Sequence, residues 1–136
     1  MNLNAVVEQL KLDEGFSAKS YFDNDQWTWG YGTKAPGPES KITKVEAEAL
    51  LIPRARLAIE DFYKVFDGVE MCEVRQHAFV NMLFNLGLTK FSKFKKVIKN
   101  AKAGDWNEAA AQAQMSLWFK QVGKRAARIV REIKEG

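Results

Sequence analysis

The N-terminal part of the chain joins a helical pattern directly to a β-hairpin pattern, and this junction most limits the folds open to it. Leu3, Val7 and Leu10 recur at helical spacing, and Gly15 is the residue type that ends a helix. Aromatic and β-branched runs then flank Asp23-Asn24-Asp25-Gln26, a cluster with the composition of a tight turn. Because helical patterns dominate the remaining sequence, we expect an α+β fold that is predominantly α.

Glu14 lies at this junction, on the last turn of the expected helix and on the same stripe as Leu10. Partial burial and the negative end of the helix dipole both favour the protonated form of an acid in such a position. A protonated carboxylic acid is what general-acid catalysis requires. Taken alone, the residue is more often a surface glutamate in a frayed last turn, and it is the hairpin residues that follow which favour the catalytic interpretation.

The hairpin contains two further candidate catalytic side chains: Asp23, at the mouth of the turn, and Thr28, on the returning strand. Together with the helix-end carboxylate, these side chains can converge on one cleft. Trp27, Trp29 and Tyr31 alternate along the returning strand and share one face, which leaves Thr28 on the other. We expect the aromatic face to be core, and a sugar-stacking platform is the alternative.

The rest of the chain is expected to be helical. Residues 35–40 form a loop, and Thr43 with Glu46 forms a capping box that opens a helix to about residue 66. Pro53 should kink or break that helix. Further helices are expected at about residues 71–85, 105–118 and 124–134.

Three side chains of the helical part have structural explanations. Asn81 shares a face with Val74 and Ala78, so its buried amide should be hydrogen-bonded, tying neighbouring backbone together. Cys72, the only cysteine, is expected to be a small buried hydrophobe, and no intrachain disulfide can form. His77 has no second histidine or cysteine placed to complete a metal site, so a core histidine is favoured.

The formal net charge of +4 favours anionic partners such as cell-wall polymers, membranes or nucleic acid. The sequence shows neither a signal peptide nor a membrane-spanning stretch that we recognise, so we expect synthesis in a cytoplasm. The last helix is amphipathic and basic, which indicates a solvated outer face or, alternatively, transient contact with an anionic membrane. No basic-aromatic pattern of a nucleic-acid-binding fold is present, and we expect no nucleic-acid partner.

The chain resembles the phage-type lysozymes, or endolysins, of glycoside hydrolase family 24. The resemblance rests on Glu14 at the end of the first helix, Asp23, Thr28 and the Gly30-Tyr31-Gly32 strand. It continues through most of the chain in the family's order, in the segments Ile42–Glu48, Asn81–Gly87, Trp106–Ala110, Trp118-Phe119 and Arg125–Arg128. It implies one lysozyme-like domain, with lobes at about 1–42 and 67–136 joined by a helix at about 43–66.

The resemblance also implies hydrolysis of the β-1,4 bond between N-acetylmuramic acid and N-acetylglucosamine in bacterial peptidoglycan, with inversion and without a cofactor. Glu14 would be the acid, and Asp23 and Thr28 would hold a water. Asp23 and Thr28 are one residue closer than in the best-known members, which makes Asp25 a competing candidate; we prefer Asp23 and interpret Asp25 as a turn former. Matching positions imply substrate-binding roles for Lys34, Phe84, Gln112 and Arg125, with the Arg125 guanidinium reaching the catalytic glutamate.

Such an enzyme would lyse the host cell as a monomer after a holin released it to the wall in the periplasm. A lytic transglycosylase is the nearest alternative, because it needs one acid and no water-holding carboxylate. A non-enzymatic cationic module that binds wall or membrane is the alternative from another class.

Overall fold

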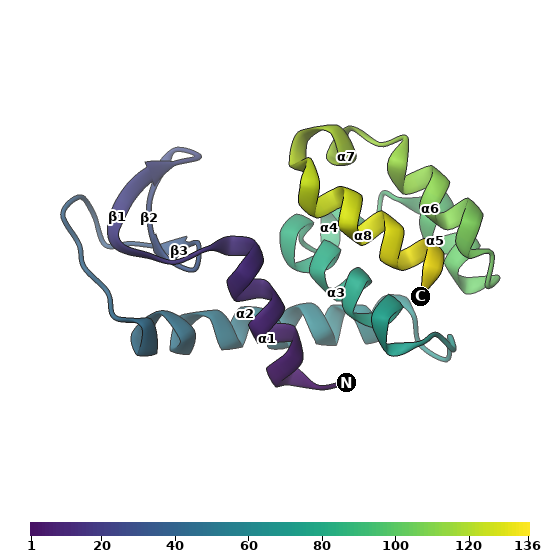
Figure 1. Ribbon diagram of the computed structural model, residues 1–136, viewed down its shortest axis with the longest axis horizontal. Coiled ribbons are helices and arrows are strands. Elements are labelled where there is room, and N and C mark those ends of the chain that lie inside the picture. The colour runs from purple at the N-terminus through teal and green to yellow at the C-terminus, as the bar shows by residue number, and fades with distance from the viewer. The chain divides into compact units, whose positions relative to one another are not determined.

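The computed structural model describes residues 1–136 and contains eight helices and one three-stranded antiparallel sheet (Figure 1). The expected fold class, α+β and predominantly α, is confirmed. The chain divides into two compact units, Asn2–Arg56 and Leu57–Gly136, with Met1 grouped with the second. In chain order the elements are α1 Leu3–Glu14, β1 Ser17–Asp23, β2 Gln26–Gly30, β3 Thr33–Lys34, α2 Lys44–Val65, α3 Glu73–Leu86, α4 Leu88–Phe91, α5 Lys95–Lys102, α6 Trp106–Gln114, α7 Leu117–Val122 and α8 Lys124–Glu135.

Helix α1 ends where the sequence predicts. The side chain of Asn2 accepts a hydrogen bond from the Ala5 N–H at 3.1 Å and caps the helix start. Gly15 follows Glu14 with φ +69°, and its N–H donates to the Lys11 carbonyl at 2.9 Å. This left-handed residue stops the helix and lets the chain turn into β1.

The hairpin turn consists of Asn24 and Asp25, with φ of +49° and +61°. Two consecutive positive φ values define the tight turn that matches strand twist, and Asn and Asp tolerate them best after Gly. The interpretation of Asp25 as a turn former therefore holds. In the ladder, Tyr21 lies opposite Thr28 and Asp23 opposite Gln26, while Thr28 lies opposite Lys34 on the next strand.

The core of the Asn2–Arg56 unit forms where α1, the sheet and the first part of α2 supply apolar side chains, including Val6, Val7, Leu10, Tyr31, Ile42, Ala47 and Leu51. Gly30 has φ +58°, and a Cβ there would come within 2.8 Å of the Ala47 Cβ. Only glycine lets β2 end so close to α2. Of the three alternating aromatics, Tyr31 is buried, whereas Trp27 and Trp29 are half-buried.

Helix α2 begins with the predicted capping box. The Thr43 N–H and hydroxyl donate to the Glu46 carboxylate at 3.1 and 2.9 Å, and the Glu46 N–H returns a bond to the Thr43 hydroxyl at 3.2 Å. The backbone bond from Thr43, and then its hydroxyl, lower the pKa of Glu46. Pro53 lies inside the helix without breaking it, since α2 is continuous from Lys44 to Val65.

The Leu57–Gly136 unit is built from helices around a chain of aromatic rings. Phe66 contacts Phe62, Phe79 and Phe91, and the series continues through Phe94 to Trp118. Helix α8 buries Ala126, Ile129, Val130 and Ile133, the face predicted from its period. It packs against α3 and α6.

Several details of this unit differ from prediction. The helix expected over residues 105–118 ends at Gln114, because Ser116 caps a new helix by accepting the Phe119 N–H at 3.2 Å; Leu117 is consequently exposed. Cys72 does lie at the N-cap of α3, but it is exposed rather than buried. Val74 is exposed too, since it lies on the first turn of α3 on the solvent side, whereas Ala78 is buried.

Candidate functional site

Glu14 is the last residue of α1 and lies against the loop that follows β2. A Cβ on Gly32, whose φ is +84°, would come within 2.7 Å of the Glu14 Oε1. The carboxylate is therefore half-buried beside bare backbone, with no side chain on Gly32 to displace it. The Gly32 carbonyl also accepts a long hydrogen bond, 3.4 Å, from the Arg54 Nη1 on α2.

Asp23 and Thr28 lie on the same sheet face. Thr28 is directly opposite Tyr21, and Asp23 is two residues beyond Tyr21 on β1, so all three side chains project to one side. Asp23 is exposed, while Thr28 is only 5% exposed. The hydroxyl therefore comes from a residue with little freedom to move, while the carboxylate is open to solvent.

Electrostatics connects these residues to Glu14. Burial, then the negative charge of Asp23, then that of Glu14, raise the pKa of the Tyr21 hydroxyl. Asp25 is not among these causes. Both predicted carboxylates thus act on one phenol, and the structure brings them to a shared region of the Asn2–Arg56 unit.

Lys34 extends the same row of side chains across the sheet. It lies opposite Thr28 on β3 and is exposed. A positive charge is thereby placed one strand away from the threonine.

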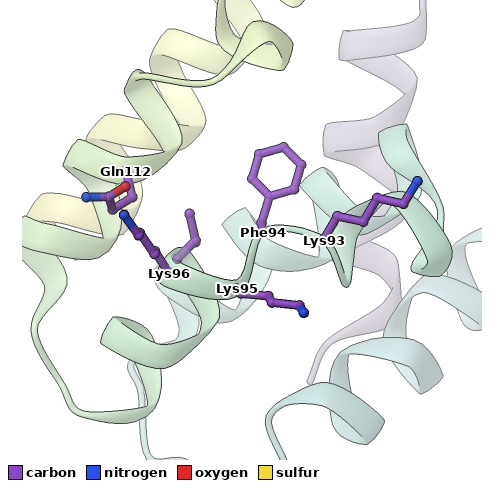
Figure 2. A pocket seen from close by; sticks show the side chains of 6 residues that line it. Lys93, Phe94, Lys95, Lys96 and Gln112 are labelled. Carbon is purple, nitrogen blue, oxygen red and sulfur yellow. The ribbon is translucent and has the colours of Figure 1, made fainter.

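The remaining predicted residues belong to the Leu57–Gly136 unit. Gln112 on α6 lines a pocket of about 320 Å³ together with Lys93, Phe94, Lys95, Lys96 and Val97. Figure 2 shows Lys96 extending toward Gln112, whereas Lys93 and Lys95 extend away from it. The Gln112 amide donates to the Glu108 carboxylate at 2.8 Å, which fixes its orientation along α6.

Arg125 on α8 is held by Asn81 on α3. The Arg125 Nε donates to the Asn81 Oδ1 at 2.8 Å, and Asn81 is buried. The buried amide is thus hydrogen-bonded as expected, and the Arg125 guanidinium is one of its partners. Phe84, half-buried on α3, does not line the pocket that contains Gln112.

No cluster of three or more metal-ligating side chains occurs among residues 1–136. His77 lies half-buried on α3 with its Nε2 3.5 Å from the Glu73 carboxylate one turn away. None of the helices has the length and apolar character needed to cross a membrane.

Comparison with known proteins agrees with this fold and arrangement. The family model described as phage lysozyme matches residues 11–134. The chain is 37% identical to a probable T4-type lysozyme 2 of Dictyostelium discoideum, covering 98% of this chain and 96% of that protein. It is 31% identical to a probable T4-type lysozyme 1 of the same organism over similar shares, 98% and 96%. It is also 37% identical to the pre-baseplate central spike protein Gp5 of Enterobacteria phage T4, covering 97% of this chain but 28% of that protein.

The chain belongs to the phage lysozyme family. Its class is therefore that of the lysozyme-type glycoside hydrolases, and peptidoglycan is the substrate class that this family implies.

The sequence predicted no site role for Tyr21, and Gly32 entered only as part of the Gly30-Tyr31-Gly32 motif. Strand alternation from Asp23 would have placed Tyr21 on the same face, and that signal was available in the sequence. The packing of Glu14 against Gly32 is a tertiary contact that no local pattern reveals.

Proposed function

We propose that this chain hydrolyses the β-1,4 bond between N-acetylmuramic acid and N-acetylglucosamine in bacterial peptidoglycan. The observation that carries the proposal is that Glu14 lies against Gly32, in the loop after β2, while the same hairpin carries Asp23 and Thr28 on one face. Two carboxylates near one another, with a buried threonine on the same sheet face, are the groups that glycoside hydrolysis requires.

Glu14 is the general acid of this proposal. It protonates the departing glycosidic oxygen, so that an alcohol leaves rather than an alkoxide. Its position supports the role, because the carboxyl group is half-buried at the negative end of α1 beside Gly32. The proton returns to Glu14 from solvent after each turnover.

Asp23 and Thr28 hold the attacking water. The exposed carboxylate accepts one of its protons, and the threonine hydroxyl fixes its position against the sugar. Attack from the face opposite the leaving group inverts the anomeric carbon, and such a geometry has carboxyl groups about 6.5–9.5 Å apart.

Substrate-binding roles are proposed for Lys34, Phe84, Gln112 and Arg125. Lys34 extends the row of site residues on the sheet, and Gln112 lines a pocket that Phe94 also lines. Arg125 is proposed to reach the catalytic glutamate. We also propose one functional domain, with lobes at about 1–42 and 67–136 joined by a helix at about 43–66.

In its biological setting, the proposed enzyme is a monomer that needs no cofactor and lyses a bacterial host. It acts on the wall in the periplasm after holin-mediated release. The structure favours this enzyme over the cationic-module alternative, because a charged binding module has no need for paired carboxylates around a buried threonine. A lytic transglycosylase stays the enzymatic alternative, and product chemistry separates the two.

A turbidity assay on outer-membrane-permeabilised Gram-negative cells tests the assignment with three variants. Glu14→Gln and Asp23→Asn should each lower the rate of lysis at least about 100-fold, because each removes a group that changes charge or accepts a proton. Asp25→Asn is the matched control and should lyse cells at close to the normal rate. Full lysis by Glu14→Gln would reject the enzyme proposal. A large loss of lysis in Asp25→Asn with a normal rate in Asp23→Asn would show that Asp25, not Asp23, is the functional carboxylate of the hairpin.

A further inference from the structure

Tyr21 lies on β1, an edge strand of the sheet, on the face that carries the proposed chemistry. The ladder places it directly opposite Thr28, and Thr28 in turn lies opposite Lys34, so the three residues form one row across β1, β2 and β3. Directly opposed side chains in an antiparallel pair have Cβ atoms about 4.5–5.5 Å apart. The two side chains therefore start from neighbouring points on one face of the sheet.

The same face brings Asp23 beside Tyr21, because residues two apart on a strand project to the same side. Tyr21 is 40% exposed, which leaves part of the ring accessible from solvent. Phe22 and Trp27, by contrast, form an edge-to-face pair on the opposite side, with ring centroids 5.5 Å apart. The hairpin thus separates an apolar aromatic face from a face bearing two hydroxyls and a carboxylate.

The environment keeps the Tyr21 hydroxyl protonated. Desolvation and the charges of Asp23 and Glu14 all raise its pKa above the ordinary value of 10.0. A phenol that stays neutral is a hydrogen-bond donor throughout the pH range in which a lysozyme would work, and a carboxylate is an acceptor. Phenylalanine at this position would keep the ring and lose the donor.

The Tyr21 hydroxyl makes no hydrogen bond to Asp23 in this structure, and Asp23 acts on it only through its charge. We propose that Tyr21 is a positioning residue of the hydrolytic site, whose hydroxyl donates a hydrogen bond to the Asp23 carboxylate once substrate and water are bound, and so directs that group at the water shared with Thr28. The inference rests on the proposed function, and it adds Tyr21 to the two carboxylates and the threonine that the mechanism already uses. Asp23 is exposed at the mouth of a hairpin and has several rotamers available to it. A neighbouring donor limits those rotamers, and a fixed geometry is what makes a general base effective.

Steady-state kinetics of Tyr21→Phe on soluble peptidoglycan fragments test the proposal. We expect kcat to fall about 10-fold to 100-fold, as for the loss of one preorganised hydrogen bond, while KM changes less than about twofold. Tyr63→Phe is the matched control, since Tyr63 is 48% exposed and lies in the other unit; both of its kinetic constants should equal those of the unmodified protein. An unchanged kcat in Tyr21→Phe, with Glu14→Gln inactive, would overturn this inference and leave the proposed function standing.

Ultraviolet titration of the phenol gives a second readout that does not depend on activity. The Tyr21 contribution is isolated as the difference between each protein and the same protein carrying Tyr21→Phe. Asp23→Asn should move the Tyr21 ionisation midpoint to lower pH, because one of the charges that raise its pKa is gone, and Asp25→Asn should leave the midpoint in place. Equal Tyr21 midpoints in the unmodified protein, Asp23→Asn and Asp25→Asn would show that the charge of Asp23 does not act on Tyr21. That result would overturn the inference whatever the kinetics.

Discussion

At the scale of single residues, the position of Glu14 depends on the absence of a side chain at Gly32. The Glu14 Oε1 occupies the space that a Cβ would need, at 2.7 Å. The backbone there also has φ +84°, a conformation that L residues adopt at a cost of about 1–2 kcal/mol. Gly32 therefore has two separable roles, one in the backbone and one in making room for the acid.

Gly32→Ala should displace the Glu14 carboxylate and lower the rate of cell lysis at least about tenfold, because misplacing a catalytic group by about 1 Å is costly. The folded state should lose only about 1–2 kcal/mol of stability from the strained φ, since the far end of a glutamate can move aside. The measurements are lysis rate and thermal unfolding.

Gly68→Ala is the matched control for this prediction. Gly68 has φ +72°, and a Cβ there would meet no atom within 4 Å, so the variant reproduces the backbone strain without the steric contact. It should show a comparable loss of stability with a normal lysis rate. Equal activity losses in the two variants would mean that strain, not displacement of Glu14, explains the effect.

At the scale of elements, α4, α5 and the residues between them carry an unbalanced positive charge. Lys90, Lys93, Lys95, Lys96, Lys99 and Lys102 are all exposed, and no acidic residue occurs between Glu73 and Asp105. Helix α8 is also basic, but Glu132 and Glu135 lie within it, and Arg128 pairs with Glu132 at 3.3 Å. The segment best suited to contact an anionic polymer is therefore α5 rather than the last helix.

The triple variant Lys95→Gln, Lys99→Gln and Lys102→Gln should weaken binding to isolated peptidoglycan at low salt about 3-fold to 10-fold, because three exposed charges no longer attract its carboxylates. The difference should disappear near about 0.5 M salt, where such charges are screened. Co-sedimentation of the proteins, each made inactive by Glu14→Gln, measures the effect. A triple variant with Lys120, Lys124 and Lys134 changed to Gln should bind more tightly than the α5 variant; the reverse order would contradict the account.

The elements with strong local signals were predictable. The end of α1 at Gly15, the Asn24-Asp25 turn, the capping box of α2 and the apolar face of α8 all follow from short patterns and appear as expected. Helices α4 and α5 were not predicted, because a four-residue helix and a lysine-rich one give little periodic signal over their length. The stop after Gln114 was missed because the Ser116 cap interrupts a pattern that otherwise continues.

The candidate site was predictable only as a set of residue types. The hairpin pattern and the resemblance to the phage-type lysozymes indicated Asp23 and Thr28, and the positive φ of Asp25 supports its interpretation as a turn residue. The prediction that Cys72 is buried was wrong, since an N-cap position leaves the side chain outside the helix, where it is exposed. Contacts between distant parts of the sequence, such as Arg125 with Asn81, have no local signature.

At the scale of the whole molecule, family and structure agree on one class of enzyme. The phage lysozyme model matches nearly the whole chain, and the Asn2–Arg56 unit holds both carboxylates and the threonine of the proposed mechanism. That unit therefore contains the acid, the base and the threonine that the proposed inverting mechanism uses.

The stereochemistry of the first product tests this account most directly. Proton NMR of peptidoglycan fragments during the first turnovers, before mutarotation, distinguishes the anomers at the new reducing end. Because water held by Asp23 and Thr28 attacks opposite the leaving group of a β-linked sugar, we predict that the α anomer of N-acetylmuramic acid forms first. A β anomer would indicate a covalent or retaining route, and a 1,6-anhydro product would indicate transglycosylation; either result would contradict the account.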